Sequence, residues 1–396
     1  MLLLDLTHTS HTQARTGIQR VARQLHTAFC AQGGEIAVCY DPWQKTWRMI
    51  EPWEEKNLAV KTAAASRGAS WPWRARFRGA LRHRLGRTST LSSQLPAHSS
   101  ASLLMPEIFS PGVAAALPAL FSQVSGPRAA IFHDAIALKL PELTPAKTVA
   151  RFPAYLRELL EFDGIVAVSE DSRQSLLDYW QLLGVRNPPP VRTIPLGLSL
   201  PAPAAQISNL RPQISNSILS VGSIEGRKNH SALLDACERL WARGLNFELR
   251  LIGLAHPQTG RAALNKVATL KNAGWPLRYD GPVDDATVAA AYEACQFTVY
   301  PSLMEGFGLP VLESLAHGKP CICSSFGALG EAANGGGCVM LDSMDVNSLA
   351  FAIMRLLQNP PDLAALATAA RARTFKSWRD YAAEVSEWLP ALPRRS

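Results

Sequence analysis

The stretch of the chain best suited to chemistry is EGFGLPVLE, residues 305–313. Gly306 and Gly308 allow backbone torsions that other residues avoid, so a ligand can approach the main chain closely. Pro310 suits the first turn of a helix, where its missing N–H is no loss. The backbone N–H groups of residues 307–309 would then lie at the positive end of a helix dipole, which attracts phosphate.

Two carboxylates flank this turn. Glu313 falls in the first turns of the expected helix and can accept two hydrogen bonds from vicinal hydroxyls, such as those of a ribose. Glu305 precedes the turn and can face a sugar. An isolated pair with this spacing is usually an ordinary loop entering a helix, so the surrounding sequence has to decide between the two interpretations.

The flanking segments favour a binding site. Residues 297–302 have the pattern of a short buried strand, residues 311–317 that of a helix, and residues 321–324 that of the next strand. Gly318 and Pro320 end the helix. The motif is therefore expected at the carboxyl edge of a parallel sheet, where open α/β folds bind ligands.

A pair of basic side chains follows another expected strand. Arg227 and Lys228 come after the apolar run 218–221 and before a helix expected from His230 to Arg243. A guanidinium binds phosphate oxygens in a fork, and an ammonium acts as a point charge. Alone, such a pair is usually a solvated surface, but beside the first motif it indicates a phosphate contact.

The first half of the chain repeats the strand-to-helix pattern. Strands are expected at residues 1–5, 129–132 and 166–168. One amphipathic helix is expected from Thr16 through His26, and Ser169 is expected to cap another helix. His133 and Asp134 directly follow the second of these strands. A lone histidine after a strand is more often structural than catalytic, but at the carboxyl end of a central strand a functional role is favoured.

Residues 300–320 closely resemble the donor-binding motif of the retaining glycosyltransferases with the GT-B fold, in particular family four (glycosyl transferases group 1). The resemblance is good at 220–230, moderate at 131–142 and poor at 40–105. It implies an α/β protein of two Rossmann-like domains that face a central cleft, with a C-terminal helix crossing back to the first domain.

The length of 396 residues suits two domains of normal size. The expected organisation is an N-terminal acceptor-binding domain at 1–200 with a basic insert at about 61–100, a proline-rich polar linker at 201–217, a C-terminal donor-binding domain at 218–375, and the crossing helix at 376–396.

The resemblance also implies roles for single residues. Glu313 would bind the ribose, and His133 and Glu305 would be the catalytic groups nearest the reacting carbon. The implied donor-binding residues are Gly17, Gly222, Arg227, Lys228, Gly281, Val283, Glu305, Gly306, Phe307, Gly308, Leu309 and Glu313. The implied acceptor contacts are Arg20, for which the donor phosphates are the alternative, and Asp134. For Gly281 and Val283, a plain turn and a core valine stay equally open.

One position departs from the family pattern. Many relatives carry an additional arginine just after the glycine of the strand, where this chain has Ser223. The charge that faces the donor diphosphate is therefore expected from Arg227 and Lys228, with Lys228 the stronger candidate.

The implied activity is transfer of a sugar from a nucleotide-diphosphate donor to a hydroxyl of a saccharide or lipid-linked acceptor, with retention of configuration, in cell-surface polysaccharide synthesis. The departing diphosphate needs charge stabilisation, which basic side chains and backbone N–H groups can supply. The sequence holds no Asp-x-Asp motif. We therefore expect a metal-independent enzyme without a cofactor, and we assign no protein nucleophile.

Mannose from a GDP donor is the first guess, because the TGIQRV start at residue 16 and the His-Asp loop look like those of bacterial mannosyltransferases of surface-polysaccharide (lipopolysaccharide) synthesis. Two alternatives remain. A sugar-nucleotide 2-epimerase shares the fold, and a non-catalytic sugar-nucleotide-binding protein would keep the same pocket.

The positive charge of the chain is concentrated in one segment. Residues 61–100 contain no acid and eight basic residues, which match the formal net charge of +8: Lys61, Arg67, Arg74, Arg76, Arg78, Arg82, Arg84 and Arg87. The apolar residues Trp71, Trp73, Phe77, Leu81 and Leu85 recur at spacings of two to four. A basic amphipathic helix on an anionic membrane, through residues 67–87, and a solvated basic loop are both open, and nucleic-acid binding is less favoured because no recognition fold accompanies the patch.

Targeting and redox signals indicate a cytoplasmic protein, peripheral at most on the cytoplasmic face of the inner membrane. Asp5 interrupts the initial leucine run, and no stretch approaches the roughly 18 apolar residues of a spanning helix. Seven cysteines without a paired CxxC spacing argue for reduced thiols and against structural zinc. Cys321 and Cys323 are expected in the core.

Overall fold

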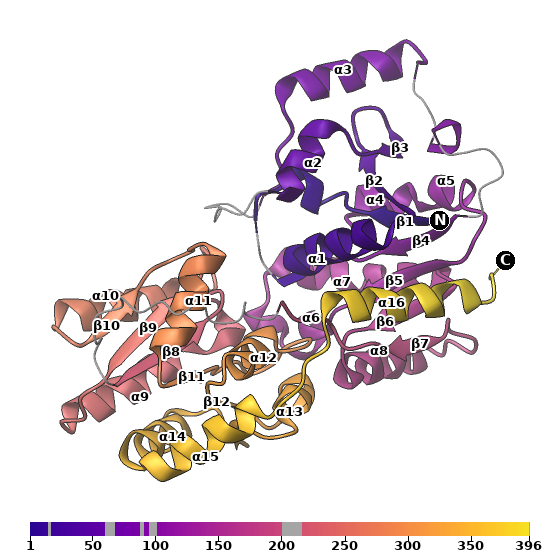
Figure 1. The fold of residues 1–396 in the computed structure, drawn as a ribbon. Helices are drawn as coiled ribbons and strands as arrows, with labels where there is room; N and C mark the ends of the chain where they lie inside the picture. Colours follow the sequence, from indigo (N-terminus) through magenta and orange to yellow (C-terminus); the bar gives the residue numbers. More distant parts are fainter. Residues whose placement is uncertain (15–16, 60–67, 88–90, 95–100, 200–215, 396) are drawn as a thin grey trace.

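The computed structural model describes residues 1–14, 17–59, 68–87, 91–94, 101–199 and 216–395. They form two sheets, each covered by helices on both faces (Figure 1). The predicted linker 201–217 and the basic residues Lys61 and Arg67 fall largely or wholly outside these residues.

The first sheet has the order β3-β2-β1-β4-β5-β6-β7. Its strands are β1 (Leu2–Asp5), β2 (Glu35–Asp41), β3 (Thr46–Met49), β4 (Ser102–Met105), β5 (Arg128–Phe132), β6 (Gly164–Ala167) and β7 (Val191–Thr193). Every pair is parallel except β2 with β3. The central strands β5 and β6 are buried along their length and, apart from Arg128, lack charged side chains, as expected for a sheet covered on both faces.

The second sheet is wholly parallel, with the order β10-β9-β8-β11-β12-β13. Its strands are β8 (Ser217–Val221), β9 (Glu248–Ile252), β10 (Leu277–Tyr279), β11 (Phe297–Val299), β12 (Cys321–Ser324) and β13 (Cys338–Leu341). Both cysteines of β12 are buried as predicted. In each sheet the ligand-accessible edge is the one at the carboxyl ends of the strands.

Helices connect the strands in both halves. The first half contains α1 (Gly17–Gln32), α2 (Pro52–Ala59), α3 (Trp73–Arg84), α4 (Pro111–Ala115), α5 (Leu117–Phe121), α6 (Ile136–Lys139), α7 (Ala146–Glu158) and α8 (Glu170–Leu182). The second half contains α9 (His230–Ala242), α10 (Arg261–Asn272), α11 (Asp285–Ala294), α12 (Leu309–Ala316), α13 (Gly327–Ala333), α14 (Val346–Gln358) and α15 (Pro360–Arg371), and α16 (Trp378–Trp388) follows. The side chain of Ser169 caps α8, as expected. None of the described helices is long and apolar enough to cross a membrane.

The last helix returns to the first half, as predicted. Tyr381 and Val385 of α16 are buried in one apolar cluster with Leu25 and Phe29 of α1. Figure 1 shows α16, in yellow, lying along the first sheet rather than the second. Because this packing buries large side chains on both partners, the end of the chain holds the two halves together.

Candidate active site

The glycine-rich turn has the local structure that its sequence predicts. Gly308 has a φ of 91° and caps α12, whose first turn contains Pro310. Gly306 lies against the first half of the chain, where a Cβ atom would stand 2.2 Å from the carbonyl oxygen of His133. No side chain fits at that distance, so close approach requires glycine at this position.

Glu305 is buried among the basic residues of the second half. Its carboxylate lies 2.8 Å from Nη1 of Arg227 and 2.5 Å from Nζ of Lys228, and it accepts a hydrogen bond from Ser302. Lys228 also donates to the hydroxyl of Tyr300, at the end of β11. The turn and the basic pair, far apart in sequence, therefore form one charged cluster.

The charges of this cluster depend on one another. Burial alone would raise the pKa of Glu305, but the positive charges of Arg227 and Lys228 outweigh it and lower that pKa to about 2. Burial would also lower the pKa of Arg227, and the carboxylates of Glu305 and Glu225 raise it instead. Glu305 is therefore an anion at neutral pH that holds two cations near the turn.

Glu313 reaches the first half of the chain. Its Oε1 accepts a hydrogen bond from the guanidinium of Arg20 in α1, and its Oε2 lies 3.4 Å from the hydroxyl of Tyr292. Tyr292 is in turn stacked on His317, with ring centroids 4.9 Å apart. Arg20, expected to face the acceptor or the phosphates, therefore contacts the carboxylate expected to bind the ribose.

His133 follows β5, and its backbone carbonyl lies against the same turn. Its Nε2 lies 2.7 Å from the carbonyl oxygen of Pro106, so this nitrogen carries the hydrogen and Nδ1 is left as an acceptor. Burial lowers the pKa of His133, which keeps the ring neutral. The carbonyl oxygen of His133 accepts a hydrogen bond from Ser172 at 2.8 Å, and Asp134 accepts one from the backbone of Ile136.

Three further glycines were predicted to contact the donor. Gly17 opens α1, and a Cβ there would meet nothing within 4 Å. Gly222 has a φ of 153° and follows β8, packed against Gly253. Gly281 has a φ of 66°, and its carbonyl accepts a hydrogen bond from Gly253. Their roles toward a donor stay predictions.

Three apolar positions complete the set. Leu309 is the first residue of α12, and Phe307 packs against the apolar cluster shared by α1 and α16. Val283 packs against a cluster that contains Leu219 and Tyr292, which is the core role left open above.

The family is identified by comparison with known proteins. Residues 204–373 match the model of the family described as Glycosyl transferases group 1. Residues 204–373 belong to the group 1 glycosyltransferase family. O-antigen chain mannosyltransferase B of Escherichia coli is 28% identical over 261 residues, which are 63% of this chain and 66% of the relative. The serotype-specific mannosyltransferase WbdA of Escherichia coli is 25% identical over 372 residues, which are 84% of this chain and 40% of WbdA.

The chain thus spans less than two thirds of the length of either relative. A solved structure of HepE from Anabaena, in complex with UDP and glucose, covers 99% of both chains with a TM-score of 0.68 and 14% identity. That likeness confirms the predicted GT-B fold of two Rossmann-like domains. Neither the family model nor the relatives support the epimerase alternative.

Sequence reasoning missed several groups at this site. Ser302 and Tyr300 contact Glu305 and Lys228, respectively, and Tyr292 contacts Glu313. A weak signal existed for the first two, because both lie between β11 and the turn. Glu331 of α13 accepts hydrogen bonds from the backbone of Glu170 and Asp171 at 2.9 and 2.7 Å, which caps α8 from the other half of the chain. No sequence pattern indicated that contact.

Two groups of side chains in the described part of the chain have the spacing of metal ligands. They are His11 with Cys39 and Glu54, and His26 with Cys30 and Glu35. In the first, the guanidinium of Arg48 lies 2.7 and 2.8 Å from the two oxygens of Glu54, and burial raises the pKa of the Cys39 thiol. A thiol must ionise to bind a metal, and a raised pKa opposes that ionisation. The Arg48–Glu54 contacts and the Cys39 pKa therefore suit an ion pair beside a neutral thiol better than a metal site.

Proposed function

We propose that this group 1 glycosyltransferase moves a sugar from a nucleotide-diphosphate donor to a hydroxyl of a saccharide or lipid-linked acceptor, with retention of configuration. The observation that carries the proposal is the cluster of Glu305, Arg227 and Lys228 beneath the glycine turn, opposite His133. The donor-binding part would be residues 218–375 and the acceptor-binding part residues 1–200.

The diphosphate would bind at the start of α12. The backbone N–H groups of Phe307, Gly308 and Leu309 belong to the N-terminus of α12, where the helix dipole is positive, and Arg227 and Lys228 add two positive charges. Negative charge grows on the leaving diphosphate as the glycosidic bond breaks, so these groups stabilise the transition state more than the ground state. A metal ion is not needed for that role.

Glu313 would bind the ribose hydroxyls and Glu305 would orient the basic pair and the sugar. The neutral His133 would accept a hydrogen bond at Nδ1 from a hydroxyl of the donor sugar, which fixes the ring beside the reacting carbon. Mannose from a GDP donor is the first choice of sugar, because the relatives from Escherichia coli are mannosyltransferases. The relative named for the O-antigen chain supports a proposed role in surface-polysaccharide synthesis.

Thermal unfolding with nucleotides tests the donor site. A nucleotide at about 100 times its Kd adds roughly 2.7 kcal/mol of stability, which is a shift of some degrees. We expect one of GDP, UDP, ADP, dTDP and CMP to raise the Tm, and we expect Glu313→Ala and Lys228→Ala to abolish the shift. Glu293→Ala and Lys266→Ala, which change surface residues outside the cluster, should retain it. A shift that survives in Lys228→Ala and Glu313→Ala would refute the site.

We further propose that α3 holds the enzyme on an anionic membrane. Trp73, Phe77, Leu81 and Leu85 follow one another at intervals of four, and all four are exposed. Six arginines lie in or just after the same helix: Arg74, Arg76, Arg78, Arg82, Arg84 and Arg87. Among the described residues of α3, Gly79 is the buried one, and it packs against Trp43, so the helix contacts the rest of the protein there. An exposed apolar row among cations suits a surface of anionic lipids.

Sedimentation with liposomes tests this interaction. We expect binding to phosphatidylglycerol vesicles and not to phosphatidylcholine vesicles, with loss of binding in Arg74/Arg76/Arg78→Ser and in Trp73/Phe77→Ser. Leu182→Ser is the matched control, because Leu182 is also an exposed apolar side chain but lies on α8. Unchanged binding by the triple arginine variant would leave α3 as a solvated basic helix.

A further inference from the structure

A cavity of about 270 Å³ lies in the first half of the chain and takes no part in the donor site. It stands at the carboxyl edge of the first sheet, where Asp5 ends β1, Tyr40 lies near the end of β2, and Glu107 follows β4. Trp71 and Gly112 line other parts of its wall. The volume falls just below the usual range for drug-sized ligands, so the cavity suits a single small ring.

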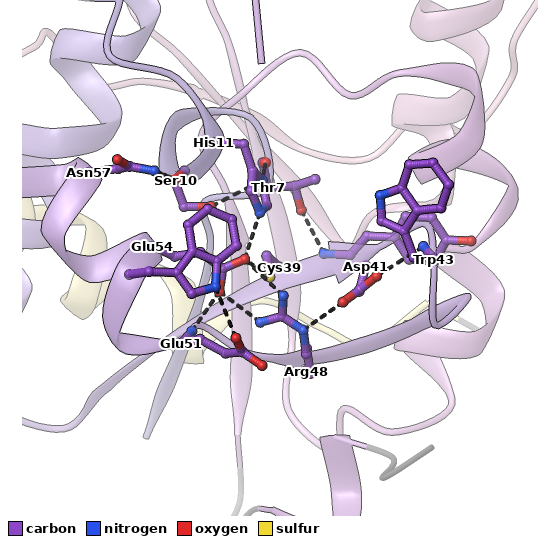
Figure 2. A network of polar contacts seen from close by, with 12 residues as sticks. Thr7, Ser10, His11, Cys39, Asp41, Trp43, Arg48, Glu51, Glu54 and Asn57 are labelled. Atoms are coloured by element: carbon purple, nitrogen blue, oxygen red, sulfur yellow. Dashed lines mark hydrogen bonds and ion pairs between the residues drawn. The ribbon is translucent and has the colours of Figure 1, made fainter. Parts of the chain in front are cut away.

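The aromatic wall of the cavity is fixed from behind. The Trp71 ring stacks on His11, with centroids 3.9 Å apart and planes 18° apart. Nε2 of His11 lies 2.6 Å from Glu54, which also forms two bonds with Arg48, and Arg48 bonds to Asp41 (Figure 2). These polar groups are buried and paired, so they hold the indole in place at little further entropic cost on binding.

Two carboxylates also line the cavity and can accept hydrogen bonds. Asp5 accepts from the backbone and hydroxyl of Thr7, and Glu107 accepts from the backbone of His8 and Thr9. Burial, together with the negative charge of Glu107, raises the pKa of Asp5 to about 7. At neutral pH Asp5 therefore exists in both forms and can accept or donate a hydrogen bond to a hydroxyl.

This chemistry differs from that of the donor site. Arg20, Arg227 and Lys228 make the donor site attractive to phosphate, whereas Asp5 and Glu107 make the cavity repel an anion. A rigid aromatic ring beside hydroxyl-binding carboxylates suits a ligand with apolar ring faces and many hydroxyls. We propose that the cavity is the acceptor subsite, and that it binds one neutral sugar ring against Trp71 with hydroxyls on Asp5 and Glu107.

The position of the cavity agrees with that role. Glu107 directly follows Pro106, whose carbonyl oxygen holds Nε2 of His133 at 2.7 Å. A single hydrogen bond therefore links the predicted catalytic histidine to the residue that precedes Glu107 in the cavity wall. Trp71 also lies two residues before α3, so a sugar in the cavity would be held close to the helix proposed to lie on the membrane. The inference rests on the proposed glycosyl transfer, which gives the acceptor its chemical class.

Saturation-transfer NMR on the full chain tests the cavity. The probes are methyl α-D-mannopyranoside and methyl α-D-glucopyranoside as neutral rings, and mannose 6-phosphate as an anionic one. We expect transfer to at least one neutral glycoside and weaker transfer to the phosphate. Trp71→Ala should weaken binding of the glycoside about threefold to tenfold, because an aromatic contact contributes about 0.5–1.5 kcal/mol.

Two further variants separate loss of the cavity from loss of the fold. Trp73→Ala removes an exposed tryptophan outside the cavity and should bind as the wild type does. Gly112→Leu leaves Trp71 in place and adds a side chain where a Cβ meets only Ser110, at 3.9 Å, so it should fill the cavity and abolish binding while α4 remains intact.

The outcomes are decisive in both directions. The inference is overturned if no neutral glycoside receives saturation, if mannose 6-phosphate binds better, or if Trp71→Ala and Gly112→Leu bind as the wild type does. The nucleotide-dependent rise in Tm reports on the donor site alone and should persist in all three variants. A sugar signal without any nucleotide shift would therefore leave the cavity in place and reject the proposed transfer.

Discussion

The guanidinium of Arg20 donates a hydrogen bond to the carboxylate of Glu313, although the two residues are 293 positions apart. One belongs to α1 in the first half and the other to α12 in the second. The residue expected to bind the donor ribose is therefore paired with a cation from the opposite half. Donor binding and the relative position of the two halves are expected to influence each other through this pair.

Contacts between the halves should control how far they separate. Arg20→Ala removes the pair with Glu313, and Glu331→Ala removes the carboxylate that caps α8. Each variant should increase the radius of gyration measured by small-angle X-ray scattering, and the double variant should increase it further. Arg186→Ala, an exposed change within the first half, is the control and should leave the radius unchanged.

The pairing of Glu305 with Lys228 should appear as a thermodynamic coupling. Glu305→Ala leaves a buried ammonium without this partner, and Lys228→Ala removes one of the two cations from Glu305. Loss of one partner of a buried pair costs about 3–5 kcal/mol, whereas replacement of both by apolar groups is often nearly neutral. Urea unfolding should therefore show that Glu305→Leu with Lys228→Met is more stable than Glu305→Leu alone. Strict additivity of the two single changes would contradict the coupling.

Gly306→Ala should prevent the turn from approaching His133. The added Cβ would lie 2.2 Å from the carbonyl oxygen of His133 and 3.1 Å from Cβ of Asp134. Neither atom can move without a shift of the backbone. We expect the far-ultraviolet circular dichroism to match the wild type while sugar transfer falls by at least two orders of magnitude, because misplacement by about 1 Å can cost a hundredfold in rate. Wild-type transfer by the variant would show that this approach is not needed.

The raised pKa of Asp5 predicts a dependence of stability on pH. Asp5 has a pKa of about 7 in the folded protein against an ordinary value of 3.8, so the folded state binds the proton more tightly. Its contribution to stability is complete below about pH 4 and is lost as the pH rises toward 7. A rise of the Asp5 pKa from 3.8 to about 7 corresponds to about 4 kcal/mol of folding free energy.

Asp5→Asn removes this titration. From pH 4 to pH 7 the wild type should lose stability relative to the variant, because only the wild type carries the Asp5 carboxyl. Above about pH 7 the difference in unfolding free energy should stay constant. Urea unfolding at several pH values measures this difference directly. A difference that does not change over this range would show that Asp5 titrates normally.

The local parts of the site were predictable because neighbouring residues determine them. The φ of Gly308, the helix after Pro310 and the strand before Glu305 follow from steric preferences within a few positions. The expected strands and most helix starts agree with the structure for the same reason. One clear difference is α1, which was expected to run through His26 and continues to Gln32, since Ala28 and Phe29 are buried.

Contacts between distant segments were not predictable in this way. The sequence places Trp71 in a basic amphipathic segment. Its position in the cavity wall depends on its stacking against His11, which lies far away in the sequence. For this segment the sequence leaves a helix and a loop equally open, and the structure has a helix at Trp73–Arg84. Asp5 was noted only for interrupting a leucine run, and its neighbour Glu107 carried no sequence signal at all.

By itself, the sequence determined the glycine-rich turn at residues 306–308, the charged residues near it and the α/β architecture, because these depend on local backbone preferences and on the spacing of apolar residues. Tertiary structure alone decided which charges meet. Arg20 pairs with Glu313, Glu305 lies between Arg227 and Lys228, and Glu331 caps a helix of the other half. Burial and Coulomb attraction act over distance in space, and the order of residues along the chain does not encode that distance directly.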